Sequence, residues 1–95
     1  MPEMRFEIEW PDGTRASCYS PSLVIKDYLE PGQHYKLDDF IERSRTALRI
    51  ASDRVAQKYG MPCGRALGQS DEIERVGARF AGRPDANVAV LSFHE

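Results

Sequence analysis

The 95-residue sequence has only two cysteines and no apolar run long enough to cross a membrane. Cys18 and Cys63 are too few for a disulfide framework, so free thiols are the simplest expectation. The longest nearly apolar stretch, Val88 to Phe93, is far short of the roughly 20 residues that a membrane-spanning helix requires. The opening Met1 to Arg5 lacks the basic start and apolar run of a signal peptide. We therefore expect a cytoplasmic protein.

An excess of charge of one sign is also missing. Thirteen lysines and arginines face 15 aspartates and glutamates, which gives a formal net charge of −2. Such a balance favours neither nucleic acid nor an anionic membrane as a partner. The length suits one compact domain over residues 1–95 and leaves no room for a second.

The first third of the chain predicts a hairpin and a short helix. Residues 4–10 alternate apolar and charged side chains, which is typical of a half-buried strand. Residues 11–14 read Pro-Asp-Gly-Thr, a turn, and residues 15–19 form a weakly patterned strand that suits a sheet edge. Ser20 is a suitable N-cap for a short helix over residues 21–29.

The middle of the chain predicts two longer helices. Apolar residues recur at helical spacing over residues 38–59, and Tyr59 widens the apolar stripe. A second helix is expected between Gly64 and Ala81, with Ser70 as an alternative start. Gly77 lies within the second apolar stripe and would permit close approach to the preceding helix.

The last strand completes an α+β fold. Residues 87–93 are largely apolar at both side-chain parities, which suits a strand covered on both faces or an interface strand. We expect a two-layer domain in which a three-stranded sheet, the N-terminal hairpin plus the C-terminal strand, is covered by two main helices and one short helix. The C-terminal strand should pair with the first strand. A homodimer would cover the exposed apolar side chains, which are Val88, Val90, Leu91 and Phe93.

Candidate reactive residues are few. Cys63 precedes a helix start, where a thiolate would be stabilised, and Cys18 is the other thiol. Packing in the core is the simpler interpretation of both. His34 and His94 with these cysteines lack the spacing of a zinc site, so no metal and no cofactor are expected.

Candidate ligand-binding residues occur in two places. Tyr19, Ser20 and Ser22 form the most distinctive local string, and their hydroxyl groups could orient a ligand or simply cap a helix. Arg45 and Arg49 share one side of the long helix and could bind an anion, although a solvated and partly paired face is the simpler interpretation. No combination of nucleophile, base and orienting group is indicated by spacing.

Several strings together resemble a known family. They are Met1-Pro2-Glu3-Met4-Arg5-Phe6, Trp10-Pro11-Asp12-Gly13, Cys18-Tyr19-Ser20-Pro21-Ser22-Leu23-Val24, Tyr28-Leu29-Glu30-Pro31-Gly32, Phe40 to Leu48, Ala51 to Val55, Tyr59-Gly60 and Cys63. The chain resembles the small nitrogen-starvation response family of bacterial gene clusters built around a nitrilase. The resemblance implies a role in the use of nitriles or cyanide as a nitrogen source. The family has no assigned catalytic residues, so none are carried over.

The sequence is compatible with three functions. The leading hypothesis is a non-enzymatic accessory protein that binds a protein of that gene cluster or a second copy of itself. The first alternative is a small enzyme that uses Cys63 or Cys18 as a thiol. The second alternative is a regulator that binds a nitrogen metabolite.

Overall fold

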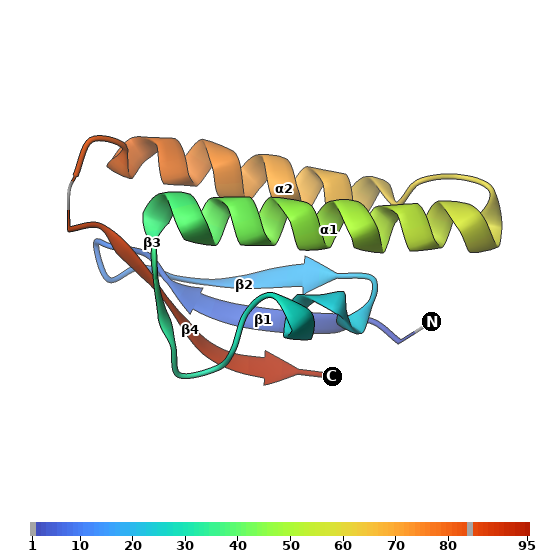
Figure 1. Cartoon of the computed structure of the whole chain (residues 1–95), viewed down its shortest axis with the longest axis horizontal. Helices are drawn as coiled ribbons and strands as arrows, with labels where there is room; N and C mark the ends of the chain where they lie inside the picture. Colours follow the sequence, from blue (N-terminus) through green and yellow to red (C-terminus); the bar gives the residue numbers. More distant parts are fainter. Residues whose placement is uncertain (1, 84) are drawn as a thin grey trace.

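A computed structural model describes residues 2–83 and 85–95 and shows two layers, a helical hairpin above an antiparallel sheet (Figure 1). The sheet order is β2-β1-β4-β3. The α+β class is therefore confirmed, as is the pairing of the C-terminal strand with the first strand. The elements are β1 Met4–Glu9, β2 Arg15–Ser20, the 3-10 helix η1 Leu23–Asp27, β3 His34–Lys36, α1 Leu37–Tyr59, α2 Gly64–Gly77, the 3-10 helix η2 Ala78–Phe80 and β4 Asn87–His94.

The β1–β2 hairpin forms as its sequence predicts. Gly13 takes a φ of 88°, which suits glycine, and its N–H donates to the Trp10 carbonyl over 2.9 Å. The Asp12 carboxylate accepts from the hydroxyl and the backbone N–H of Thr14, and these hydrogen bonds lower the pKa of Asp12. β2 lies at the edge of the sheet, as expected.

The sheet has four strands, and the prediction of three was wrong. The additional strand, β3, is only three residues long, and His34 and Lys36 on it are exposed. It pairs with β4 through the register His34↔Ala89 to Lys36↔Asn87. A strand this short and polar carries no detectable alternation of hydrophobicity, which is why residues 34–36 read as a loop.

A β-bulge in β4 explains why that strand is apolar at both parities. Ile8 of β1 pairs with Val90 and Glu7 pairs with Ser92, so Leu91 is an extra residue between them. After the bulge the alternation shifts by one, and Phe93 lies opposite Phe6. The interpretation as a strand covered on both faces is thereby corrected, because the apolar residues on either side of the bulge turn toward the same helical layer.

The outer face of the sheet is polar. Arg5, Glu7 and Glu9 of β1 alternate with the buried residues of that strand. Their neighbours across the sheet include Arg15 of β2 and Ser92 of β4. A face of this composition is stable in water and does not by itself require a partner.

The two long helices form at nearly the predicted boundaries. α2 begins at Gly64, so the alternative start at Ser70 is wrong, and it continues beyond Gly77 only as the 3-10 turn η2. The predicted close approach at Gly77 is confirmed, because this glycine packs directly against Ile41 of α1. Tyr59 is 65% exposed and is therefore not part of the core stripe.

The short helix differs from its prediction. It is a 3-10 helix over Leu23–Asp27 rather than residues 21–29, and its N-cap is Ser22 rather than Ser20. The Ser22 Oγ accepts from the Val24 N–H over 3.3 Å. The residue before Pro31 is biased away from helix, and Val24 and Ile25 are β-branched, so a full α-helix is disfavoured here.

The core lies between the two layers around an aromatic cluster. The Trp10 ring meets Phe40 of α1 edge-on at 5.9 Å between centroids and stacks against Phe80 of η2 at 6.0 Å. Phe6 and Ile8 of β1 are completely buried beside them. This cluster joins β1, α1 and η2 into one unit.

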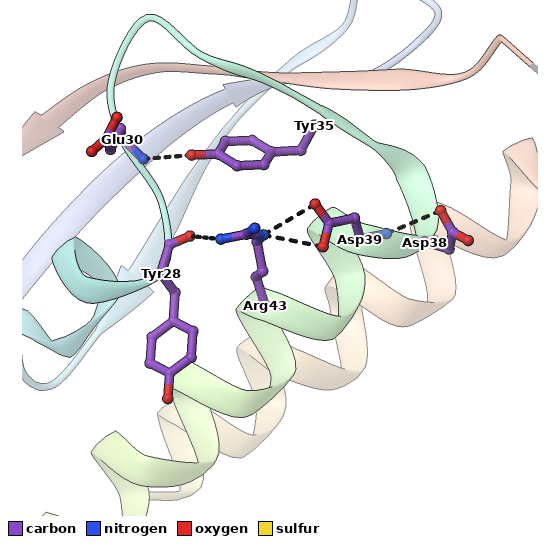
Figure 2. Close-up of polar contacts among 6 residues, drawn as sticks. All are labelled: Tyr28, Glu30, Tyr35, Asp38, Asp39 and Arg43. Atoms are coloured by element: carbon purple, nitrogen blue, oxygen red, sulfur yellow. Dashed lines mark hydrogen bonds and ion pairs between the residues drawn. The ribbon is translucent and has the colours of Figure 1, made fainter.

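Arg43 on α1 holds the loop that carries β3 (Figure 2). Its Nη1 donates to the Tyr28 carbonyl over 2.9 Å, and its Nε donates to the Asp39 carboxylate over 3.0 Å. Its guanidinium also lies 5.2 Å from the centroid of the Tyr35 ring, and the Tyr35 hydroxyl accepts from the Glu30 N–H over 2.9 Å. The loop is thus positioned by polar contacts that pattern analysis cannot detect.

Candidate functional site

The two predicted thiols lie in different environments. Cys18 on β2 is 2% exposed, and burial raises its pKa to about 12, so its thiol is protonated at neutral pH. Cys63 is partly exposed at the N-cap of α2, and its N–H donates to the Ser52 Oγ over 3.0 Å. A buried thiol with a raised pKa is a poor nucleophile, which leaves Cys63 as the accessible one.

Tyr19 lies between two arginines at the edge of the sheet. The Arg65 guanidinium stands 3.8 Å from the centroid of the Tyr19 ring, and that of Arg5 stands 5.9 Å from it. The Tyr19 hydroxyl donates to Glu3 over 3.0 Å, while its backbone N–H donates to the Gln69 side chain. Burial and then the contact with Glu3 raise the pKa of Tyr19. These contacts anchor α2 to the edge strand.

Ser20 and Ser22 are used within the structure. Both are buried, and the Ser20 Oγ donates to the Ser22 carbonyl over 2.8 Å. Ser22 caps η1. Their hydroxyl groups are thus engaged in the turn that leads out of β2.

Arg45 and Arg49 do lie together, on a shallow groove of about 340 Å³ between α1 and α2. Arg45 forms ion pairs with Glu42 and with Glu74, the latter over 3.4 Å. Asp71 also lines this groove. The neighbouring carboxylates offset the positive charge, which agrees with a partly paired helix face.

The four predicted interface residues do not share a surface. Val88 and Val90 are at most 1% exposed and form part of the core, and Phe93 packs partly buried against it. Leu91 is partly exposed at the bulge. Two of the four side chains are therefore already covered by the helices of the same chain.

The largest exposed apolar side chains lie elsewhere, at and beside the turn between the two long helices. They belong to the helical hairpin, which extends beyond the ends of strands β2 and β4 (Figure 1). Tyr59 is 65% exposed, Met61 73% and Leu67 44%. We name residues 53–67, which include the turn between the helices, the projecting end. Sequence reasoning missed it, although apolar residues beside the helix terminators Gly60 and Pro62 were a visible signal.

No group of three or more metal-binding side chains occurs within residues 2–83 and 85–95. His94 lies 3.0 Å from the Ser92 Oγ and 3.9 Å from Glu7, on the exposed face of the sheet. A single nitrogen, Nε2, makes both contacts, so the imidazole cannot take a proton from the serine while the carboxylate orients its other nitrogen. His34 lies on the neighbouring strand β3, but it pairs with Ala89, five residues along β4 from His94. The same described residues contain no helix long and apolar enough to span a membrane.

The family is identified by comparison with known proteins. The model of the family described as nitrogen starvation-induced protein NitG matches residues 5–93, nearly the whole chain. The chain belongs to the NitG family. No curated protein and no solved structure matches it significantly. The resemblance to a nitrogen-starvation response family is thus confirmed.

Membership in the NitG family links the chain to nitrogen starvation, and it assigns no reaction, partner or residue. The match runs from the second residue of β1 to the last but one residue of β4, and it includes the projecting end.

Proposed function

We propose that this NitG-family protein is a non-enzymatic accessory protein that binds another protein through the projecting end. The observation that carries this proposal is the exposure of Tyr59, Met61 and Leu67 on one extension of the molecule. Exposed apolar side chains that gather in one place mark interaction surfaces more often than scattered ones do. Tyrosine and methionine are also among the residues enriched at protein interfaces.

The charge of the projecting end indicates the chemistry of the partner. It carries three cations, Arg54, Lys58 and Arg65, against the single carboxylate of Asp53, while the whole chain has a net charge of −2. Within residues 2–83 and 85–95, none of these three cations forms an ion pair. Complementary potentials favour association, so the partner should present an acidic surface around an apolar pocket.

The proposed setting is the cytoplasmic assimilation of nitrogen from nitriles or cyanide. This part of the proposal depends on the resemblance to a family whose genes lie in clusters built around a nitrilase. The partner is then another protein of that cluster, and the nitrilase is the first to test. A homodimer is the other form of the proposal, since a second copy carries acidic side chains elsewhere on its surface.

Growth of a host strain that lacks the gene tests the proposal. A nitrile is supplied as the sole nitrogen source, and the strain is complemented with wild type, with the double variant Tyr59→Ser/Met61→Ser or with Cys63→Ser. We expect the strain that carries the double variant not to grow and the strain that carries Cys63→Ser to grow. The opposite result would favour the thiol-dependent enzyme instead.

Binding of purified proteins provides the second measurement. Lys58→Glu should weaken the complex with the nitrilase, whereas Arg79→Glu, at the far end of the hairpin, should leave it unchanged. Light scattering at high micromolar concentration examines self-association. A strict monomer that also fails to bind the cluster proteins would reject the proposal.

A further inference from the structure

A second candidate site lies at the opposite end of the helical hairpin. The start of α1, the end of α2 and η2 enclose an open groove of about 650 Å³, which we name the η2 groove. Leu37, Ile41 and Phe80 are among the apolar residues that line it. This volume lies within the range of about 300–1,000 Å³ that is usual for small-molecule sites.

The apolar lining combines two core residues, Phe80 and Ala86, with two partly buried residues that pack against the core, Leu37 and Ile41. Phe80 is 5% exposed and stacks on Trp10, and Ala86, also in the lining, is 7% exposed. Ile41 is held against Gly77 of α2. A surface of this kind is already formed before a ligand arrives, so binding requires little ordering of the protein.

Two cations of the groove form no ion pair with the carboxylates that line it. Lys36 and Arg83 line it, and neither forms an ion pair among the described residues. The Arg83 guanidinium lies 5.3 Å from the centroid of the Phe80 ring, so positive charge stands beside the apolar lining. A guanidinium presents two parallel donors that match the geometry of a carboxylate.

The remaining charges favour an anion of charge −1. Arg45, Asp38 and Glu74 also line the groove, and Arg45 is paired with Glu74. With Lys36 and Arg83 included, the lining carries three cations and two carboxylates. The two carboxylates would repel a compact dianion such as phosphate more strongly than a monoanion.

We propose that the η2 groove binds a small organic monocarboxylate with an apolar body. The carboxylate pairs with Arg83 or Lys36, and the body lies on the partly exposed side chains of Leu37 and Ile41. This inference goes beyond the proposed function. The groove and the projecting end lie at opposite ends of the hairpin, so either site can fail its test without affecting the other.

The test is a titration of the ¹⁵N-labelled full chain followed by the backbone amide shifts. The probe is phenylacetate. We expect saturable shifts at Ile41, Gly77 and Gly82, with a Kd of about 1 mM or tighter. Phenylethanol (the body without the charge), acetate (the charge without the body) and inorganic phosphate should each bind at least about tenfold more weakly, a difference of 1.4 kcal/mol.

Two exposed positions supply the variants. Arg83→Gln should weaken phenylacetate binding about fivefold or more, and Ala78→Phe should abolish it by filling the groove. Arg15→Gln, on β2 in the other layer, is the matched control and should bind like wild type. Circular dichroism establishes that each variant is folded.

Four outcomes would overturn the proposal. They are an absence of saturable shifts, shifts confined to residues outside the groove, equal affinity for phenylethanol, or unchanged affinity in both Arg83→Gln and Ala78→Phe. The first two would exclude the site, and the last two would exclude the assigned chemistry. If Ala78→Phe does not fold, the comparison of Arg83→Gln with Arg15→Gln decides the role of the charge.

Discussion

Ile41 of α1 occupies the space that a side chain on Gly77 of α2 would need. A Cβ atom at position 77 would lie 2.5 Å from the Ile41 Cδ1 and 3.3 Å from its Cγ1. The first distance is far below van der Waals contact, so any side chain at position 77 would force the end of the Ile41 side chain to move. The pair also lines the η2 groove.

The first prediction concerns this pair. Gly77→Ala should lower the free energy of unfolding by about 1 kcal/mol, because Ile41 must move. In an Ile41→Val background, which lacks the Cδ1 atom, the same substitution should be neutral or slightly stabilising, since alanine is the better helix former. Urea unfolding of the four proteins measures the coupling. Equal effects in both backgrounds would show that the contact is unimportant.

The second prediction concerns the thiols. The native protein should react with Ellman's reagent at one cysteine, the partly exposed Cys63, and the unfolded protein at both. Cys63→Ser should remove the reaction of the native protein, and Cys18→Ala should leave it unchanged. A native Cys63→Ser variant that still reacts quickly would show that Cys18 becomes accessible.

The third prediction follows from the raised pKa of Cys18. Its contribution to stability is complete below about pH 9, the value of an unperturbed thiol here, and is lost as pH rises toward about 12. Over that range the unfolded chain releases a proton that the folded chain retains. Between about pH 8 and pH 11, wild type should lose about 2–3 kcal/mol more than Cys18→Ala. Parallel pH curves for the two proteins would argue against the burial of this thiol.

The fourth prediction concerns the loop that carries β3. Arg43→Ala should cost about 1–2 kcal/mol, because the Tyr28 carbonyl and the Asp39 carboxylate both lose a donor (Figure 2). Arg43→Lys should not restore this stability, since a single ammonium cannot reproduce the fork of contacts. Arg49→Ala, for which the described residues show no ion pair, is the control and should change stability by less than about 0.5 kcal/mol. A loss as small as that of the control would show that these contacts contribute little.

Much of the fold could be predicted because its main elements are amphipathic. The alternation from Met4 to Trp10 and the helical stripe that includes Leu48 and Ala51 are both consequences of one buried face, and the structure buries these residues. The terminator Gly60 also takes the left-handed conformation expected at a helix end, with a φ of 84°.

The remaining features could not be predicted because their causes are not periodic. β3 is determined by its pairing with β4 and by the contacts of Arg43, which lies outside that strand. The bulge at Leu91 shifts the alternation within β4, so a one-sided strand resembles a two-sided one in the sequence.

The candidate sites were harder to predict than the fold. Tyr19, Ser20 and Ser22 are engaged in local contacts, and Cys18 is buried. Lys36 and Arg83 are 47 positions apart and line one groove only because the C-terminal end of α2 returns to the start of α1. Proximity of this kind arises from topology, which spacing along the chain does not encode.

Because the hairpin extends past the strands, local stability should differ between its projecting end and the rest of the domain. The buried residues of α1 end at Ser52, so the last turns of this helix bury less surface against the rest of the fold than its middle does. Amide hydrogens beyond Ser52 should therefore exchange with solvent through small local openings, while those near Phe40 and Leu48 should exchange only when the whole domain unfolds. A segment that opens without disturbing the sheet can adjust its shape to a partner at little cost to the fold.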